Sequence, residues 1–228
     1  MTATGAIATQ CAGTTVLLLP QRALYWPDER TLFVADAHLG KSASFRARGV
    51  FVPRGTTSET LDRLDRAIAH TLPRRLLFLG DFFHSRASQA AATLDALGLW
   101  RNRHQAITMH LVGGNHDRHA GAPPSRLAIE PLAVNTPLGP FVLAHEPAVS
   151  DGGYVLAGHL HPAYRLTGRA GDSLRLPCFW LRSRCLVVPA LGSFTGGALI
   201  QPMRADKVFL VTDERVFAVP ISRERSTS

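Results

Sequence analysis

Three apolar runs of this sequence each end in polar side chains. Of all the features of the sequence, this repeated pattern limits the possible folds most strongly. The runs TLFVADAH, LLFLGD and HLVGGNHD begin with the aliphatic and aromatic residues of buried strands and end in carboxylates, amides or imidazoles. Segments with helical periodicity separate the runs, which is typical of strands joined by crossover helices. In such a sheet the carboxyl ends of the strands share one edge, where loops converge. The sequence therefore predicts a polar site at that edge.

Two helices are expected between these strands. The first has a possible capping box at Thr56 and Glu59 and ends at Pro73. Its apolar residues recur at helical spacing as Leu61, Leu64, Ile68 and Leu72. The second helix is expected within residues 85–104, with Ser85 as a possible cap.

The remaining segments predict strands. Residues 1–30 contain the apolar runs TTVLLLP and RALYW, followed by a Pro-Asp-Glu turn. From about residue 129 the helical period disappears, and the apolar runs are typical of mostly antiparallel strands. With 228 residues, 46% of them hydrophobic, the chain is expected to form one domain over residues 1–228. The fold class predicted is an α+β sandwich whose second half is largely β, with a frayed tail at 222–228.

Later apolar runs also end in histidines. FVLAHE supplies His145, and YVLAGHLH supplies His159 and His161. In an extended chain, residues two positions apart have their side chains on the same face of the strand. The imidazoles of His159 and His161 are therefore expected to point to the same side. An isolated pair of this kind is more typical of two surface histidines at a strand end than of a site, so the other segments must decide.

The chemistry of these strand ends suits divalent metal ions. Asp81 by itself could cap a helix and Asn115 by itself could sit in a turn, but an ordered set at five strand ends is hard to explain in that way. Imidazole, carboxylate and amide ligands together favour Mn, Fe, Zn or Co over Mg or Ca. The three cysteines are too widely spaced for a Cys-based zinc site. The candidate ligands are Asp36, His38, Asp81, Asn115, His145, His159 and His161.

Over roughly residues 31–197 the chain resembles the calcineurin-like metallophosphoesterases. The resemblance rests on the ordered series D-x-H, G-D, G-N-H-D, H and G-H-x-H, found as Asp36-Ala37-His38, Gly80-Asp81, Gly114-Asn115-His116-Asp117, His145 and Gly158-His159-Leu160-His161. It implies a four-layer αββα sandwich of two facing mixed sheets with a dinuclear centre at one end. It also implies that Asp36, His38 and His161 hold one ion, that Asn115, His145 and His159 hold the other, and that Asp81 bridges them.

The catalytic residues follow from the same resemblance. Two cations would activate water for attack on a phosphate, and His116 would protonate the leaving oxygen. Many relatives have a second acid in the series G-D-x-x-D, which orients the catalytic histidine, but this chain has His84 at that place. Either His84 serves in the cleft or Asp117 takes the orienting part.

A narrower resemblance concerns the compact size and residues 175–197, which look like those of the bacterial ligase-associated DNA damage response endonucleases. It implies DNA phosphodiesters as substrate and a helicase and an ATP-dependent DNA ligase as partners. We expect single-stranded DNA or processed ends as the form of DNA that is bound, and Mn²⁺ as the first choice among the metals that the ligands favour. Phe179 and Trp180 in this stretch are more typical of core residues than of a platform for bases.

A formal charge of +8, almost wholly from arginine, agrees with a polyanionic substrate, although a preference for arginine codons would give the same charge. Several of the arginines follow metal motifs closely and could grip phosphates: Arg46, Arg48, Arg165, Arg169, Arg175, Arg182 and Arg184.

Other functions are less consistent with the sequence. A small-molecule or nucleotide phosphoesterase would need an apolar substrate-binding insertion, for which the chain has no spare length. A non-catalytic interaction module would not need a complete ligand set. With no apolar run of about 18 residues and no basic secretory start, we expect no membrane segment and a cytoplasmic location.

Overall fold

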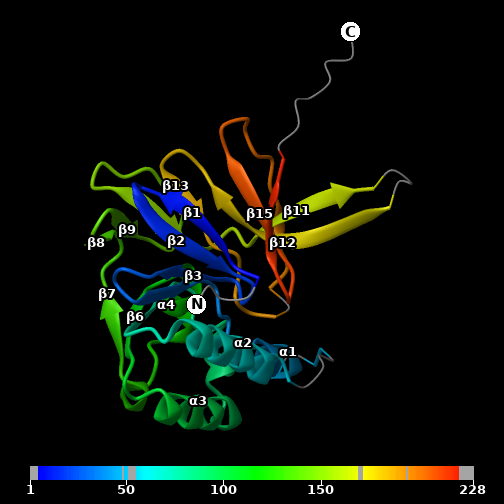
Figure 1. Cartoon of the computed structure of the whole chain (residues 1–228). Helices are drawn as coiled ribbons and strands as arrows, with labels where there is room; N and C mark the ends of the chain where they lie inside the picture. Colours follow the sequence, from blue (N-terminus) through cyan, green and yellow to red (C-terminus); the bar gives the residue numbers. More distant parts are fainter. Residues whose placement is uncertain (1–4, 48, 51–54, 169–171, 194, 221–228) are drawn as a thin grey trace.

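Two β-sheets and a group of helices make up the computed structural model, which describes residues 5–47, 49–50, 55–168, 172–193 and 195–220 (Figure 1). The tail predicted at 222–228 lies outside the described residues. The helices are α1 (Lys41–Ala47), α2 (Thr56–Thr71), the 3₁₀ helix η1 (Arg86–Gln89), α3 (Ala91–Arg103), α4 (Asn115–Ala120) and the 3₁₀ helix η2 (Ser125–Leu127).

The first sheet has seven strands in chain order. They are β1 (Ile7–Cys11), β2 (Thr14–Leu19), β3 (Ala23–Trp26), β4 (Thr31–Val34), β5 (Arg75–Leu79), β6 (Thr108–Val112) and β7 (Ile129–Leu132). The pairs from β1 to β4 are antiparallel, and the pairs from β4 to β7 are parallel. The carboxyl ends of β4, β5 and β6 therefore lie along one edge, as the alternation of strand and helix predicts.

The second sheet has nine strands, in the order β14-β11-β12-β13-β10-β9-β8, with β15 beside β12 and β16 beside β15. They are β8 (Thr136–Leu138), β9 (Phe141–Leu143), β10 (Tyr154–Ala157), β11 (Pro162–Thr167), β12 (Ser173–Leu181), β13 (Cys185–Val187), β14 (Ala198–Leu199), β15 (Lys207–Val211) and β16 (Val216–Val219). Most pairs are antiparallel, as expected, but β9, β10 and β13 run parallel to one another. The carboxyl ends of β9 and β10 consequently point the same way.

Two apolar layers hold the molecule together. Buried residues of α2 and α3, such as Leu64 and Trp100, pack on one face of the first sheet. Residues of its other face, such as Phe33, pack between the sheets against Phe141 and Phe179 of the second sheet. This arrangement confirms the α+β sandwich of two facing mixed sheets, and Phe179 is a core residue, as its sequence context indicates.

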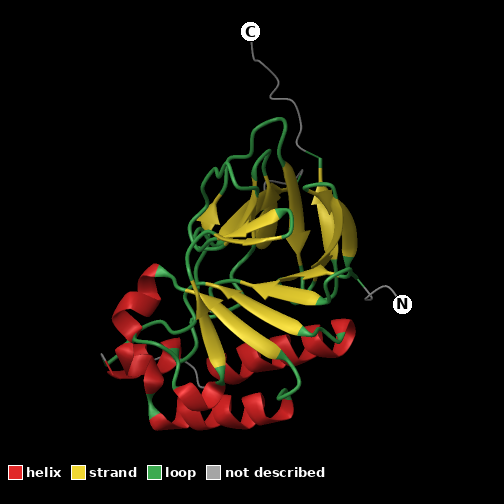
Figure 2. Cartoon of the chain, turned by 90° about the vertical axis from the view of Figure 1, so that its left-hand side faces the viewer, coloured by secondary structure: helices red, strands yellow, loops and turns green. Residues whose placement is uncertain are grey.

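The layers beyond the two sheets differ from the expected αββα order. The described helices gather on the outer face of the first sheet (Figure 2). On the outer face of the second sheet, the described residues form strands and loops, and Gly152 in the loop before β10 lies against Val142. The helical period indeed disappears after residue 129, so this half of the chain supplies no amphipathic helix to cover that face.

The local signals for the first helix require correction. Helix α2 begins after Gly55, whose left-handed backbone (φ 110°) makes it the N-cap, so Thr56 is a buried helical residue and no Thr56–Glu59 capping box forms. At the other end the chain leaves the helix before Pro73, because the ring of a proline disfavours helical backbone angles at the residue before it. Leu72 consequently has φ 45° and a 66% exposed side chain instead of a place in the core.

The second helix is also divided. Ser85 precedes the short helix η1, whereas α3 begins six residues later at Ala91. Tertiary packing accounts for the division, because Ser88 is fully buried against Gly40 and its hydroxyl accepts a hydrogen bond from the Ser85 amide at 3.2 Å. No helix in the described part of the chain combines the length and apolar character that crossing a bilayer requires.

A carboxylate joins α2 to α3 away from the strand ends. Asp65 accepts hydrogen bonds from Trp100 Nε1 at 2.8 Å and from Arg103 at 2.9 Å, and it lies 2.6 Å from His104 Nε2. Burial raises the pKa of Asp65, but the hydrogen bonds from the three neighbouring side chains outweigh it and leave that pKa below its usual value.

Candidate metal centre

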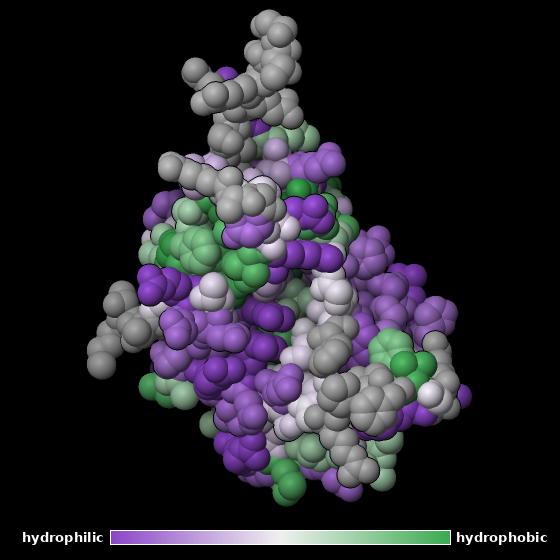
Figure 3. Space-filling model, turned by 90° about the vertical axis from the view of Figure 1, so that its right-hand side faces the viewer, coloured by the Kyte–Doolittle hydropathy of each residue, from purple (hydrophilic) through white to green (hydrophobic). Residues whose placement is uncertain are grey.

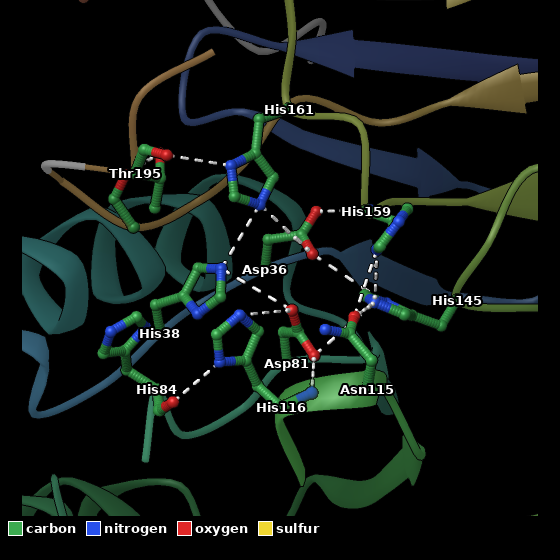
Figure 4. A network of polar contacts seen from close by, with 12 residues as sticks. Asp36, His38, Asp81, His84, Asn115, His116, His145, His159, His161 and Thr195 are labelled. Carbon is green, nitrogen blue, oxygen red and sulfur yellow. Dashed lines mark hydrogen bonds and ion pairs between the residues drawn. The ribbon is translucent and has the colours of Figure 1, made fainter. Parts of the chain in front are cut away.

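The polar ends of five strands meet in one network (Figure 4). Asp36 and His38 follow β4, Asp81 follows β5, and Asn115 follows β6. From the second sheet, His145 follows β9, whereas His159 and His161 lie between β10 and β11. All seven side chains predicted from the sequence are therefore brought together.

The backbone around this network is strained. Asp36, His38, Asp81, His159 and His161 have φ between 43° and 68°, in the left-handed region that residues other than glycine seldom adopt, although asparagine, aspartate and histidine do so more often than the rest. Each such residue costs on the order of 1 kcal/mol or more, and strain of this kind gathers at functional sites. The backbone thus directs these side chains inward at a cost in stability.

One group of ligand atoms comes from Asp36, His38 and His161. The Nε2 atoms of the two histidines lie 3.2 Å apart, and His161 Nε2 lies 3.5 Å from Asp36 Oδ1. Asp36 is fully buried, and its Oδ1 accepts no hydrogen bond from the described residues. The other carboxylate oxygen accepts a hydrogen bond from the His159 amide at 2.8 Å.

A second group comes from Asn115, His145 and His159. Asn115 Oδ1 lies 2.8 Å from His145 Nε2 and 3.1 Å from His159 Nδ1, and these two nitrogens are 3.1 Å apart. Asp81 lies between the two groups, with Oδ1 3.5 Å from His145 Nε2 and Oδ2 3.7 Å from His38 Nε2.

These separations match what a metal ion requires of its ligands. With metal–nitrogen distances of about 2.1 Å, adjacent ligand atoms lie about 3.0 Å apart in octahedral and about 3.4 Å apart in tetrahedral geometry. The closest separations within each group fall between 2.8 and 3.5 Å. The side chains His38, His161 and Asp36 form one of the described clusters able to hold an ion, and Asp36, Asp81 and His145 form another.

Backbone carbonyls fix the orientation of three imidazoles. The Nδ1 atoms of His145, His161 and His116 lie 3.0, 3.0 and 2.7 Å from the carbonyl oxygens of Leu79, Thr195 and His84, respectively. Because a carbonyl only accepts, each Nδ1 must carry the hydrogen, and Nε2 of the neutral ring keeps its lone pair. Hydrogen bonds of this kind orient histidine ligands of metals.

Thr195, whose carbonyl oxygen lies 3.0 Å from His161 Nδ1, is a site residue that the sequence did not single out. Its carbonyl belongs to the segment 190–197, which two backbone hydrogen bonds tie to the end of β4 at Ala35 and Asp36. The abundance of small residues in LGSFTGG was the only available signal, because carbonyls leave no trace in side-chain chemistry.

The surroundings shift the pKa values of His38 and His161 in opposite directions. Burial, together with the nearby His161 and Lys41, lowers the pKa of His38 to about 2, so this ring is neutral. Burial also lowers the pKa of His161, but its interaction with Asp36 outweighs this effect and raises the pKa above its usual value. A neutral His38 ring is the form that can donate a lone pair to a metal.

His116 lies at the mouth of the network on the ring of His84. The two imidazoles stack with centroids 4.9 Å apart and planes 27° from parallel, and His84 stacks in turn on Phe45 at 5.9 Å. The His116 side chain is 36% exposed, and its Nε2 lies 4.0 Å from Asp81 Oδ2. His116 is therefore a partly exposed ring next to the ligand groups that can exchange a proton with a bound molecule.

Asp117 serves the backbone. Its Oδ2 accepts a hydrogen bond from the Gly114 amide at 2.8 Å, and its Oδ1 accepts others from the amides of Phe82 and Phe83. Burial raises the pKa of Asp117 against the effect of these bonds. The Asp117 carboxylate thus ties the loop after β6 to the loop after β5. The hydrogen-bond partner of His116 Nδ1 is a different group, the backbone carbonyl oxygen of His84.

The expected geometry of His159 and His161 needs correction. They do not extend a strand with a shared face, because β10 ends at Ala157 and both residues have left-handed backbones in the turn before β11. Figure 4 shows the two rings pointing to different neighbours, with His159 near His145 and His161 near His38. The turn therefore spans both ligand groups.

Residues 29–163, more than half of the chain, match the family model of the calcineurin-like phosphoesterases. The chain belongs to this family. The solved structure of the nuclease MPE from Pseudomonas putida is similar to this calcineurin-like phosphoesterase over 94% of the present chain and 100% of its own, with 40% identity and a TM-score of 0.83. The phosphoesterase Yfce from E. coli has 14% identity and a TM-score of 0.42, with 84% and 99% of the two chains covered. Among curated proteins, none matches the chain.

The family resemblance inferred from the strand ends is thus confirmed, and the similarity to a nuclease is consistent with the narrower resemblance to DNA endonucleases. As a calcineurin-like phosphoesterase with clusters of histidine and aspartate able to hold metal, the chain is a metal-dependent hydrolase.

Proposed function

We propose that this phosphoesterase is a nuclease that hydrolyses DNA phosphodiester bonds with two divalent metal ions. The observation that carries the proposal is the pair of ligand groups on either side of Asp81, in a chain 40% identical to a nuclease over almost its whole length. Metal-dependent phosphoester hydrolysis is common to the family, whereas the choice of DNA draws on the nuclease and on the net charge of +8.

The proposed ligands follow the two groups. Asp36, His38 and His161 would hold one ion, Asn115, His145 and His159 would hold the other, and Asp81 would be shared between them. We propose Mn²⁺ as the metal, with Fe, Zn or Co as substitutes, because the ligands mix nitrogen and oxygen donors. The ions supply Lewis-acid activation of the attacking water and neutralise charge on the phosphate.

We assign the role of general acid to His116. Its Nδ1–H is held by the His84 carbonyl, so that the proton to be transferred is carried on Nε2, the nitrogen on the side of Asp81. From there it can reach the leaving oxygen of a phosphate bound at the ligand groups. Acid catalysis of this type contributes about 10²- to 10⁴-fold to a rate.

This chain has His84 where many relatives have a second acid that orients the catalytic histidine. We propose that His84 and Asp117 position His116 and take no part in the reaction themselves. His84 supplies its carbonyl and a ring against which His116 stacks. Asp117 holds together the two loops that carry Asp81 and Asn115. Both effects fix the place of the acid relative to the ligand groups.

The cellular setting belongs to the same proposal. We infer that the substrate is single-stranded DNA or a processed end, that the enzyme acts as one domain in the cytoplasm, and that it works in DNA repair beside a helicase and an ATP-dependent DNA ligase. The support for these partners is the resemblance of residues 175–197 to ligase-associated endonucleases.

A single set of assays tests the proposed reaction. Purified protein would be incubated with Mn²⁺ and labelled single-stranded, duplex and hairpin DNA, alongside a chromogenic phosphodiester and a chromogenic phosphomonoester. We expect cleavage of DNA and of the diester, both abolished by a chelator and restored by metal. Hydrolysis of the monoester alone would refute the nuclease assignment and favour a small-molecule phosphoesterase.

A matched variant excludes contaminating nuclease. Asp81→Asn keeps the size of the side chain but removes the charge between the two ligand groups, and it would be purified in parallel. DNA cleavage that survives in this variant with the same metal dependence would have to come from another protein or another site.

A further inference from the structure

A pocket of about 350 Å³ adjoins the candidate metal centre beside His161. Arg22 and Arg175 supply its cationic side chains, and Gly192, Ser193 and Thr195 supply part of its wall. No carboxylate lines the pocket among the described residues. Its size is that of a site for a small molecule or a single nucleotide unit, and its charge suits an anion.

Arg22 is built into the wall of this pocket. Its Nη1 lies 3.4 and 3.5 Å from the carbonyl oxygens of Ala190 and Gly192, in the same segment that orients His161. Burial and the neighbouring Arg63 lower the pKa of Arg22 to about 10, so the guanidinium remains protonated at neutral pH. A fixed positive charge therefore lines the same pocket as the proposed metal ligand His161.

The strands β11 and β12 continue the pocket away from the metal centre as a projecting hairpin (Figure 1). Arg165 of β11 and Arg175 of β12 are directly opposite each other in this antiparallel pair, and both are exposed. The two side chains lie on the face that also carries Ala163 and Pro177 of the pocket.

Like charges directly opposite each other destabilise an antiparallel pair. Neither Arg165 nor Arg175 forms an ion pair with a carboxylate in the parts of the chain that the structure describes. The pair thus has a cost in stability and no carboxylate partner among the described residues, which favours an external anion as its partner. On the side of the molecule where β11 and β12 project, hydrophilic residues gather around a hollow (Figure 3).

Other arginines that follow the metal motifs have different partners. Arg182 lies over the Trp180 ring at 4.9 Å, Arg184 bonds the Ser150 carbonyl and Asp151, and Arg46 lines a separate hollow beside α2. Arg48 and Arg169 lie outside the described residues. The structure therefore selects Arg165 and Arg175 from the predicted set and adds Arg22, which the sequence did not single out.

We propose that the pocket and the arginine pair of β11–β12 form a subsite that binds the phosphates of single-stranded DNA on one side of the bond to be cut. This inference rests on the proposed function. Arg165 lies four positions after His161 in the sequence, which spans at most about 13 Å at 3.3 Å per position. That distance corresponds to about four nucleotides of stacked strand at 3.4 Å each, or fewer if the strand is extended.

The test compares Arg165→Gln/Arg175→Gln with the control Arg66→Gln/Arg74→Gln, which removes the same charge. Arg66 and Arg74 are exposed, and Arg74 precedes β5 at the amino ends of the parallel strands, the edge opposite to the site. KM would be measured with Mn²⁺ for labelled oligothymidylates of 2 to 12 nucleotides, at several salt concentrations, with the chromogenic diester as a small substrate.

Each phosphate contact on a single strand contributes about 0.7 to the slope of log affinity against log salt. Loss of two contacts should lower the slope of the double variant by about 1.4 relative to wild type. The ratio of KM in the variant to KM in the wild type, for long oligonucleotides, should then be about 25-fold larger at 0.1 M salt than at 1 M salt. We expect kcat/KM to fall much more for long oligonucleotides than for the small diester, and the gain in affinity with length up to about four nucleotides to disappear. The control pair should keep the wild-type length dependence.

Thermal unfolding distinguishes this binding role from a structural role of the two arginines. If they stabilised the fold, their replacement would lower the unfolding temperature. The double variant should unfold at the wild-type temperature or above it, because the repulsion within the hairpin is removed. If the variant and the control have equal KM and equal salt slopes on DNA that the wild type cleaves, the subsite is refuted while the nuclease function stands. If the wild type cleaves the diester but no DNA, the proposed function is refuted, and the subsite with it.

Discussion

A methyl group on Gly114 should displace the ligand Asp81. The Cβ of Gly114→Ala would lie 2.3 Å from Asp81 Oδ1 and 2.5 Å from the Asp81 backbone nitrogen. Gly114 has φ −99° and ψ 178°, a conformation open to alanine, so the effect is one of space and not of backbone strain. Because one of the obstructing atoms belongs to the backbone, rotation of the aspartate side chain cannot relieve the contact.

The size of the displacement follows from these distances. Cβ atoms in proteins essentially never approach another heavy atom within 3.0 Å, so the pair must separate by at least 0.7 Å, the difference between 2.3 and 3.0 Å. A misplacement of about 1 Å in a catalytic arrangement can reduce a rate about 100-fold. Overpacking of this kind also destabilises a protein by about 1–3 kcal/mol. We therefore expect a folded protein with kcat/KM about 100-fold below wild type.

The neighbouring residue provides the control. A Cβ on Gly113 would meet no atom within 4 Å, so Gly113→Ala should keep activity within about twofold. Both variants would be assayed on the chromogenic diester with Mn²⁺, with metal content by elemental analysis and stability by thermal unfolding. Wild-type activity and metal content in Gly114→Ala would refute the inference that close packing of the two loops places Asp81.

Three further predictions concern the bridge, the acid and the stability of the helical layer. Asp81→Asn should lose bound metal, measured by elemental analysis after dialysis, and full occupancy of two ions would exclude Asp81 as the bridge. His116→Ala should retain its metals but lose about 10²- to 10⁴-fold in turnover of DNA and less with a nitrophenyl diester, whose leaving group needs no proton; equal losses on both substrates would contradict an acid role. Asp65→Asn should unfold about 1 kcal/mol more easily than wild type at pH 7. Since the pKa of Asp65 lies below 3.8, its charged hydrogen bonds contribute above that pH and disappear as the pH falls through the folded-state value, so urea melts should converge in acid. A difference that is constant from pH 7 to pH 3 would contradict this linkage.

Strand chemistry made much of the fold predictable. The runs ending at Asp36, Asp81 and Asn115 form neighbouring parallel strands, because apolar runs separated by helices leave few other arrangements. Helix boundaries were less predictable. Ser85 is the N-cap of the short helix η1 and not of α3, whereas Gly55 and not Thr56 is the N-cap of α2.

The candidate site was predictable as a set of residues and only partly as a geometry. His159 and His161 were expected on a common strand face, yet left-handed backbones turn them toward different partners. A two-residue period assumes an extended chain, and nothing local in the sequence reports that the segment is a turn. The role of the Thr195 carbonyl was likewise hidden, because every residue has a carbonyl and only the packing of its segment on β4 aims this one.

The sequence by itself determined the alternation of strands and helices, the side chains at the strand ends and, through their order, the family. These properties depend on periodicity and on the chemistry of single residues, which a chain carries before it folds. Only the tertiary structure decided which nitrogen of each imidazole faces the centre, that Asp117 binds backbone amides, and that Arg22, Arg165 and Arg175 share one side of it. Such properties arise where residues distant in sequence meet, because hydrogen bonds, close packing and charge act over a few ångströms of space.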